Sequence, residues 1–204
     1  KELRELENLL NGLSFSFVFQ KKPLGDGHAI LQAAKMAQNE PVGVLFGDDL
    51  IVADTPALLQ LIKVFNTSQS SVIALKNLPK DKVSSYGVAA VEKIANRLYK
   101  IKKIVEKPSP EEAPSDFAIV GKYVLAPEVF DYLGRTPPSQ KGGILLAEVF
   151  DKMLLDGKTI YGYELQGDWL ECGDKLKWLK SFIYFALRDP RFEKELKEYL
   201  KEIR

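Results

Sequence analysis

A short apolar run that ends in paired carboxylates is the feature that most constrains the fold of this chain. Residues 42–46 (Val-Gly-Val-Leu-Phe) lead directly into Gly47, Asp48 and Asp49. A continuously apolar run is typical of a strand that is buried on both faces of an α/β sheet. Ligands bind such sheets beyond the carboxyl ends of the strands, which makes Asp48 a candidate ligand for a hard cation such as Mg²⁺. The alternative is that both carboxylates only shape a turn or cap a helix.

The size and charge of the chain exclude several classes of protein. With 204 residues and 46% hydrophobic content, the chain can bury a core as one domain. Its 29 Lys and Arg balance 28 Asp and Glu, so no bulk positive charge indicates a nucleic-acid partner. Cys172 is the only cysteine, which excludes an internal disulfide and a cysteine-based zinc cluster and fits a reducing compartment. No apolar stretch is long enough to span a membrane, and the first residues do not resemble a signal peptide. We therefore expect a cytoplasmic protein.

Alternating helical and strand periodicities predict an α/β domain with a mixed sheet. The first half of the chain follows a strand-helix-strand-helix-strand order, which predicts a parallel sheet with crossover helices. Segments 86–92 and 98–106 predict an antiparallel insertion, and 109–115 an exposed loop. The expected strands are 15–19, 42–46, 71–75, 86–92, 98–106, 117–125 and 159–165. The expected helices are 3–10, 29–37, one that begins after Thr55-Pro56, one that begins at Pro127, 145–155 and 192–203. The helix after Pro56 is expected to bury Leu58, Leu59, Ile62 and Phe65.

Six strings in this sequence resemble, in order and in spacing, those of bacterial UTP-glucose-1-phosphate uridylyltransferases. The resemblance covers nearly all of the chain. It implies the nucleotide-diphospho-sugar transferase fold, a Rossmann-like mixed sheet flanked by helices, in a single nucleotidyltransferase domain over residues 1–204. The strings are QKKPLGDGHA at 20–29, FGDD at 46–49, YGV at 86–88, VEKP at 105–108, AIVGKY at 118–123 and CGDKL at 172–176.

The resemblance also implies a reaction. In this family uridylyl transfer from UTP to glucose 1-phosphate gives UDP-glucose and pyrophosphate, with Mg²⁺ as the cofactor. The expected partners are therefore UTP, glucose 1-phosphate and UDP-glucose, with no nucleic acid and no membrane. A homo-oligomer is expected as well, because the amphipathic segments 3–10 and 192–203 offer apolar faces for subunit contacts. Covering the core of the same subunit is an equally good use of those faces.

Three residues of the first string match a base-binding loop. Gln20 corresponds to the glutamine that recognises uracil, and a side-chain amide offers both a donor and an acceptor to a base edge. Gly25 and Gly27 correspond to positions where the backbone approaches the base and the ribose, which a Cβ atom would obstruct. A plain turn is the alternative for both glycines. We expect His28 to fix this loop by hydrogen bonds rather than to act as a base.

The predicted catalytic residues are Asp48, which corresponds to the Mg²⁺-binding aspartate of the family, and Lys107, which neutralises the sugar phosphate. Asp49 is expected to cap or shape the turn, and Glu106 to accept hydrogen bonds from sugar hydroxyls. Neighbouring strand residues point to opposite faces, so Glu106 and Lys107 reach one ligand only where the strand ends, as Pro108 indicates. An exposed charge pair is the alternative for these two residues. The remaining predicted substrate-binding residues are Gly87, Val120 and Gly121, which match the sugar pocket.

Two positions depart from the family pattern. Glu171 stands where the family usually has the second metal-binding aspartate, and its extra methylene moves the carboxylate oxygens and adds a rotor. Glu171 is thus the second predicted metal ligand, with altered geometry. Segment 143–148 (Gly-Ile-Leu-Leu-Ala-Glu) replaces a polar string, and Leu145 and Ala147 cannot make the hydrogen bonds of Gln and Thr. Either this wall repacks or it forms subunit contacts.

The glycine-rich loop with Arg and Lys that wraps the triphosphate in this family does not occur among these residues. The sequence therefore predicts an N-terminally truncated form of the fold, in which one sheet edge and the triphosphate both lose partners. Two alternatives to uridylyl transfer stay open. One is a related sugar-1-phosphate nucleotidyltransferase, thymidylyl or other, and the second is a noncatalytic fragment that binds a nucleotide sugar.

Overall fold

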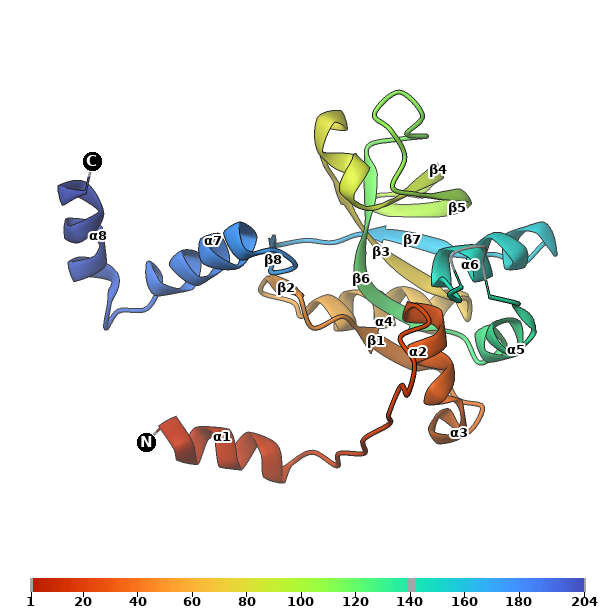
Figure 1. The fold of residues 1–204 in the computed structure, drawn as a ribbon, viewed down its shortest axis with the longest axis horizontal. Coiled ribbons are helices and arrows are strands. Elements are labelled where there is room, and N and C mark those ends of the chain that lie inside the picture. Colours follow the sequence, from red (N-terminus) through yellow and green to blue (C-terminus); the bar gives the residue numbers. More distant parts are fainter. Residues whose placement is uncertain (1, 139–141, 204) are drawn as a thin grey trace.

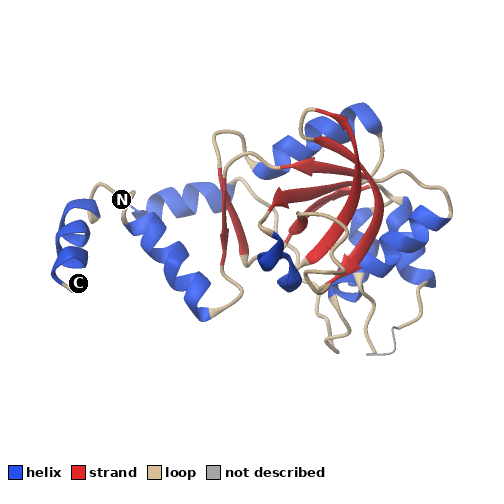
Figure 2. Ribbon diagram, turned by 90° about the horizontal axis from the view of Figure 1, so that it is seen from above, coloured by secondary structure: helices blue, strands red, loops and turns tan. Residues whose placement is uncertain are grey.

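The computed structural model describes residues 2–138 and 142–203. A six-stranded mixed sheet forms the centre, with helices on both faces and a separate two-stranded sheet beside it (Figures 1 and 2). The helices are α1 (Glu2–Asn11), α2 (Asp26–Gln32), α3 (Ala34–Ala37), α4 (Ala57–Ser68), the 3₁₀ helix η1 (Lys80–Ser85), α5 (Glu128–Arg135), α6 (Leu146–Leu155), α7 (Lys175–Ala186) and α8 (Glu193–Glu202). The strands are β1 (Val42–Leu45), β2 (Asp49–Val52), β3 (Val72–Asn77), β4 (Gly87–Ala95), β5 (Leu98–Glu106), β6 (Phe117–Leu125), β7 (Tyr161–Glu164) and β8 (Asp168–Glu171).

The strand order of the large sheet is β1-β6-β3-β7-β5-β4, with a further contact between β4 and β6. Strands β3 and β7 run parallel, whereas β6 runs antiparallel to both β1 and β3. The mixed sheet and the antiparallel β4–β5 pair are therefore confirmed. Strands β1 and β3 run in the same direction, as predicted for the first half, but they do not pair with each other, because the antiparallel β6 lies between them. Almost all of β6 is buried, as expected of a central strand.

Two hydrophobic cores cover opposite faces of this sheet. Helices α2, α5 and α6 pack on one face, where Ile73 and Leu75 meet Phe150. Helix α4 packs on the other face, where Leu61 contacts the cluster that holds Val72. Successive strand residues point to opposite faces, so β3 supplies side chains to both cores. Since both cores pack on the same sheet, the loops at the edge of that sheet are positioned by one packed unit.

Strand β1, which leads to Asp48, forms as predicted but is not buried on both faces. Within the described residues it pairs on one side only, with β6. Its burial alternates along the strand, and Leu45 is 55% exposed. The expectation of double burial is therefore wrong. An apolar run indicates that a strand can be covered on both faces, but the covering elements decide whether it is.

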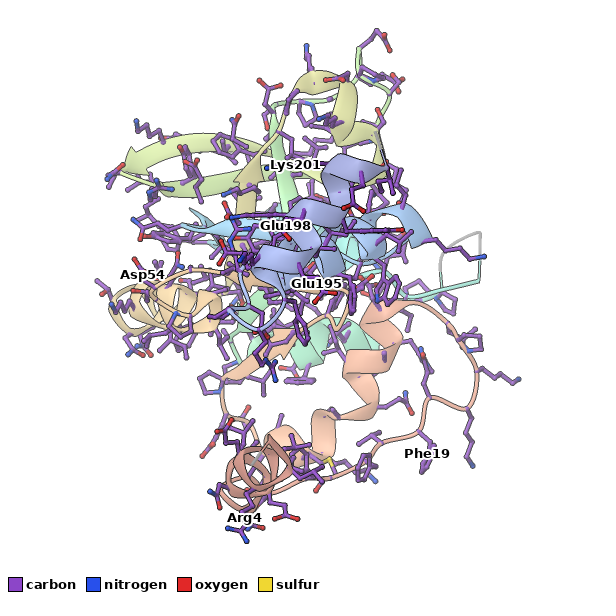
Figure 3. All side chains as sticks on the ribbon, turned by 90° about the vertical axis from the view of Figure 1, so that its left-hand side faces the viewer. Arg4, Phe19, Asp54, Glu195, Glu198 and Lys201 are labelled. Atoms are coloured by element: carbon purple, nitrogen blue, oxygen red, sulfur yellow. The ribbon has the colours of Figure 1, made fainter. Side chains whose placement is uncertain are left out.

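The strand predicted over residues 15–19 is absent from the structure. Phe15, Phe17 and Phe19 alternate with smaller residues, yet the segment is an irregular connection between α1 and α2. Phe19 is 82% exposed and lies on this connection away from the sheet (Figure 3). An alternating pattern becomes a strand only where a neighbouring strand supplies hydrogen bonds, and no described strand pairs with this segment.

Helix α4 begins after Pro56 as predicted, but its buried face is rotated from the predicted one. Phe65 is buried, whereas Leu59 is exposed and Leu58 and Ile62 are only partly buried. Gln60 takes a buried position instead. Its amide donates to Thr55 O at 2.8 Å and accepts from Gln166 N at 2.9 Å. Satisfied hydrogen bonds allow this polar side chain to replace a leucine in the core.

The remaining predicted elements form with small shifts in their bounds, except that the single helix predicted over 29–37 is divided into α2 and α3. Segment 109–115 is a loop, although Ala113 is buried beside Val83 and Val88. The terminal helix is α8, but α7 and the small β2–β8 sheet were not predicted. Helices α1, α7 and α8 extend away from the large sheet (Figure 1). None of the helices in the described ranges is long and apolar enough to cross a membrane.

Candidate active site

The turn after β1 brings Asp48 and Glu171 together. Asp49 pairs with Glu171 in the β2–β8 sheet, and Cys172 N donates to Asp48 O at 2.7 Å. A Cβ atom on Gly173 would lie 3.2 Å from Glu171 Oε1 and 3.4 Å from Asp48 Oδ2. Because glycine lacks that atom, the two carboxylates border the same small gap. Segments far apart in the sequence thus supply one acidic pair.

Asp49 fastens this turn to its surroundings. Trp169 Nε1 donates to Asp49 Oδ1 at 2.6 Å, and Gly121 N donates to Asp49 Oδ2 at 3.1 Å. Burial raises the pKa of Asp49, and the two hydrogen bonds and Lys122 oppose that rise. The side chain therefore ties β2 to both β8 and β6, while its neighbour Asp48 stays exposed. This arrangement matches the turn-shaping role expected for Asp49.

A buried lysine supports the turn from below. Lys122 Nζ donates to Phe46 O at 2.8 Å and to Gly121 O at 3.3 Å. Burial lowers the pKa of Lys122, and the nearby carboxylates of Asp49 and Asp48 oppose that change. Sequence reasoning missed this residue. Its one signal was a charged side chain in the middle of an otherwise apolar strand.

A cleft of about 280 Å³ opens beside the acidic pair and gathers most of the predicted site residues. A larger cavity of about 450 Å³ lies between α4 and the β4–β5 hairpin, but none of the predicted residues lines it. The predicted residues that line the smaller cleft are Asp48, Gly87, Glu106, Lys107, Gly121 and Glu171. Sequence reasoning missed other lining residues, which include Asp26, Phe46, Tyr86, Ile119, Tyr123 and Phe150.

Glu106 and Lys107 both reach this cleft because the strand ends between them. Strand β5 stops at Glu106, and Lys107 adopts a left-handed backbone with φ of 46°. Its backbone N–H donates to Tyr86 O at 3.0 Å, which holds this turn against the start of β4. Left-handed backbone is unfavourable for a residue with a side chain, and such conformations gather at functional sites. The ending of the strand at Pro108 is as predicted.

Gln20, Gly25 and Gly27 lie beside the cleft rather than in its lining. Gln20 Nε2 donates to Gly25 O at 2.9 Å and lies 2.9 Å from His28 Nδ1. A Cβ atom on Gly25 or Gly27 would lie 2.6 Å or 2.9 Å from Ile144 O, so both glycines allow the loop to pack on that backbone. His28 holds the loop through hydrogen bonds, as expected. The loop borders the site through Asp26, which lies between the two glycines.

The structure places Val120 away from the cleft. Its side chain is fully buried in the core beneath α4, whereas the neighbouring Ile119 and Gly121 line the cleft. This alternation follows from the strand geometry of β6. A contact from Val120 to a ligand can therefore come only from its backbone. Gly121 cannot carry a side chain here, because a Cβ atom would lie 2.6 Å from Phe46 Cβ.

The departure at 143–148 is a repacked wall. Ile144 N donates to Leu24 O at 2.7 Å, and Leu146 is buried in the core. Asp26 Oδ1 accepts from Leu146 N at 3.0 Å, at the start of α6. Ala147 lines the cleft. The segment therefore supports the glycine loop by backbone contacts and apolar packing, which is the first of the two alternatives drawn from the sequence.

Glu171 is already engaged by two protein groups. Tyr86 Oη donates to Glu171 Oε2, and Lys177 Nζ lies 2.8 Å from Glu171 Oε1. Burial raises the pKa of Tyr86, and its hydrogen bond to Glu171 adds to that rise. Burial alone would lower the pKa of Lys177, but its hydrogen bonds to Glu171 and Tyr86 raise it overall. The ammonium group of Lys177 is therefore charged at neutral pH.

The donor set at this turn fits Mg²⁺ in one of its usual modes. Asp48 and Glu171 offer hard carboxylate oxygens across the gap at Gly173. No cluster of three or more His, Cys, Asp or Glu arranged to hold a metal occurs in the described part of the chain. Mg²⁺ commonly takes only one or two carboxylates and completes its shell with substrate phosphates and water. The residues present therefore suit a metal shared with a phosphate ligand.

Comparison with known proteins places the chain in a family. A family model described as nucleotidyl transferase matches residues 2–183. UTP-glucose-1-phosphate uridylyltransferase 1 of Staphylococcus saprophyticus is 36% identical over 201 residues, which are 98% of this chain and 70% of that protein. The enzyme of the same name from Staphylococcus haemolyticus is 38% identical over 187 residues, which are 92% of this chain and 65% of that protein. The chain thus spans about two thirds of the length of these relatives.

Solved structures agree with this placement and confirm the expected fold class. A UDP-glucose pyrophosphorylase complexed with UDP-glucose superposes with a TM-score of 0.86 at 32% identity, covering 92% of this chain and 72% of that one. A UTP-bound UGPase from Acinetobacter baumannii superposes with a TM-score of 0.83 at 31% identity, covering 100% and 73%. The chain therefore belongs to the nucleotidyl transferase family, among the UTP-glucose-1-phosphate uridylyltransferases.

Proposed function

We propose that this chain supplies the metal and sugar-phosphate sides of a uridylyl transfer from UTP to glucose 1-phosphate, which yields UDP-glucose and pyrophosphate. The observation that carries the proposal is the convergence of Asp48, Glu171, Glu106 and Lys107 on one cleft of about 280 Å³. The relatives named above for this reaction, and the solved relatives that hold UDP-glucose or UTP, support it. The shared sheet between the two cores supports a single nucleotidyltransferase domain over residues 1–204.

The proposed chemistry is a direct in-line displacement. A phosphate oxygen of glucose 1-phosphate forms a bond to the α-phosphorus of UTP while the bond to pyrophosphate breaks. No covalent bond to the protein forms, so the protein contributes orientation and charge. Lys107 would neutralise the sugar phosphate, and Glu106 would accept hydrogen bonds from the sugar hydroxyls. Asp48 and Glu171 would hold Mg²⁺, which when bound neutralises phosphate charge.

The remaining proposed contacts come from the loops around the cleft. Gln20 would read the uracil edge, and to do so its amide must exchange the hydrogen bonds that it now makes within the loop. Gly25 and Gly27 would approach the base and ribose through their backbone. Gly87 and the backbone of Val120 and Gly121 would border the sugar. Each of these contacts is a proposal drawn from the family pattern.

A cytoplasmic location and a homo-oligomeric state complete the proposal. The single, partly buried Cys172 fits a reducing compartment. The leucines of α1 are exposed, as are Tyr199 of α8 and the flanking Phe192 and Ile203, which leaves faces for subunit contacts. Size-exclusion chromatography with light scattering would measure the oligomeric state directly.

Two measurements test the function. The first is calorimetric titration with UDP-glucose and Mg²⁺, and the second is an assay of pyrophosphate release from UTP and glucose 1-phosphate. We expect UDP-glucose to bind, and Asp48→Asn to weaken the Mg²⁺-dependent part of binding at least tenfold while leaving the fold intact, since Asp48 is exposed. Lys180→Met on the exposed face of α7 is the control. Binding without pyrophosphate release would favour a noncatalytic nucleotide-sugar-binding fragment. Stronger competition by thymidine nucleotides than by uridine nucleotides would favour a thymidylyltransferase.

A further inference from the structure

The ammonium group of Lys177 pairs with Glu171, one member of the acidic pair. Its Nζ lies 2.8 Å from Glu171 Oε1 and 3.3 Å from Tyr86 Oη, and it stands 5.3 Å from the centre of the Tyr86 ring. The side chain of Glu171 is only 20% exposed. The Oε1 atom that meets Lys177 is the same atom that faces the gap at Gly173. Lys177 and a metal ion would therefore draw on the same oxygen.

Lys177 also has a second carboxylate within reach. Its Nζ lies 3.4 Å from Asp174 Oδ2, and the other oxygen of Asp174 accepts from Lys177 N at 2.9 Å as the N-cap of α7. A lysine side chain is flexible and carries three donors. The ammonium group can thus leave Glu171 and remain paired with Asp174. Tyr86 Oη donates to Glu171 Oε2, the carboxylate oxygen that does not meet Lys177.

We propose that Lys177 is a positioning residue that competes with the divalent cation for Glu171 and thereby sets the metal affinity of the site. This inference rests on the proposed function, because it takes Asp48 and Glu171 as the metal ligands. With Lys177 on Glu171, Asp48 alone is open to the cation. When the cation arrives with its phosphate ligand, Lys177 moves to Asp174 and Glu171 becomes available. Metal binding is thereby coupled to the position of one side chain.

Mn²⁺ titration followed by electron paramagnetic resonance of the free ion tests this inference on the whole chain. We expect Lys177→Met and Lys177→Gln to bind Mn²⁺ about fivefold more tightly than the original chain, because a partly exposed ion pair no longer has to be broken. Lys180→Met removes the same charge from the same helix without contacting Glu171, and we expect it to change the affinity less than about twofold. Circular dichroism melts verify that each variant folds.

A second background separates competition for Glu171 from a general charge effect. In Glu171→Gln the carboxylate is gone, so Lys177→Met should give no further gain in Mn²⁺ affinity beyond that of Lys180→Met. An equal gain in both backgrounds overturns the inference, as does a Lys177→Met variant that binds Mn²⁺ no better than Lys180→Met. The proposed function is judged separately by UDP-glucose binding, so a chain that ignores UDP-glucose refutes that function while the Mn²⁺ titration still decides the role of Lys177.

Discussion

Lys122 Nζ donates a 2.8 Å hydrogen bond to the carbonyl oxygen of Phe46 from a residue that is only 6% exposed. This bond joins the centre of the sheet to the turn that presents Asp48. Buried lysines are rare unless they are paired, and the partly buried Asp49 is the carboxylate that most favours the charged form of Lys122. The position of Asp48 therefore depends on the charged side chain of Lys122, which does not line the cleft.

Replacing Lys122 with Met should destabilise the chain by about 2–3 kcal/mol, because it leaves the Asp49 carboxylate buried without its cation. Denaturant unfolding followed by circular dichroism measures this loss. The double variant Lys122→Met with Asp49→Asn should recover part of it, since no lone charge remains. If the double variant is less stable than Lys122→Met, the hydrogen bonds and not the charge balance account for the effect.

The left-handed backbone at Lys107 predicts an unusual order of stability among its variants. Lys107→Gly should be about 1 kcal/mol more stable than Lys107→Ala, because glycine accepts φ of 46° and alanine does not. Both variants should lose UDP-glucose affinity, since both lack the ammonium group. Thermal melts and calorimetry measure the two effects. Equal stability of Gly and Ala at this position would show that the turn relaxes when the lysine is removed.

Gly121 should tolerate no side chain. A Cβ atom there would lie 2.5 Å from Asp49 Oδ2 and 2.6 Å from Phe46 Cβ, so Gly121→Ala should cost about 3 kcal/mol and displace the turn. Gly134 in α5 is the matched control, because an added Cβ would meet nothing within 4 Å. Gly134→Ala should gain about 0.5 kcal/mol from helix propensity. Urea unfolding measures the change in unfolding free energy of both variants. Similar values for Gly121→Ala and Gly134→Ala would show that the turn moves to make room for the added Cβ atom.

Asp151 predicts a pH-dependent contribution to stability that is independent of the active site. Burial raises the pKa of Asp151 above 3.8, although it accepts a 3.1 Å hydrogen bond from Ile104 N. Between the unfolded and folded pKa values the folded chain binds more protons, so stability from this group falls as pH rises through that window. The burial cost is then fully present above the folded pKa.

Asp151→Asn keeps an acceptor for Ile104 N and removes the titration. The unfolding free energy of the original chain minus that of Asp151→Asn should therefore decrease from about pH 4 to about pH 7. Parallel denaturant titrations at both pH values measure this difference. An increase with pH would mean that the hydrogen bond from Ile104 N and the attraction of Lys103, which both lower the pKa of Asp151, outweigh the effect of burial.

Local patterns in the sequence were enough to predict elements that a run of apolar residues and its flanking residues define by themselves. Strand β6 was predicted with the observed bounds, because 117–125 is a long apolar run between a loop and Pro127. The place of β6 between β1 and β3 was not predictable, because it depends on pairings between residues 40 to 83 positions apart, which no local period encodes. The failed strand at 15–19 has the same cause. Its alternation was correct for a strand, but no strand among the described residues pairs with it.

The candidate site divides in a similar way. Glu106 and Lys107 could be placed because a strand and a proline stand next to each other in the sequence. Asp48 and Glu171 come together through the β2–β8 sheet. Each of these two strands has four residues, which is too short for a hydrophobic periodicity to be recognised. Lys122 was missed because a single charged residue in an apolar strand does not reveal its hydrogen-bond partner, here Phe46 O, which is distant in the sequence. Gln20 was predicted from the family resemblance and stays a prediction, but its hydrogen bonds inside the loop were not predicted.

Trp169 gives this site an optical reporter of its own. Its indole N–H donates to Asp49 Oδ1 and its ring lies 4.9 Å from that of Tyr86, so the fluorophore contacts the supports of both acidic ligands. Trp178, the second of the two tryptophans, stands exposed on α7, and replacing it with Phe leaves Trp169 as the one tryptophan. Emission from that variant would then follow occupancy of the acidic turn in real time, without any attached dye.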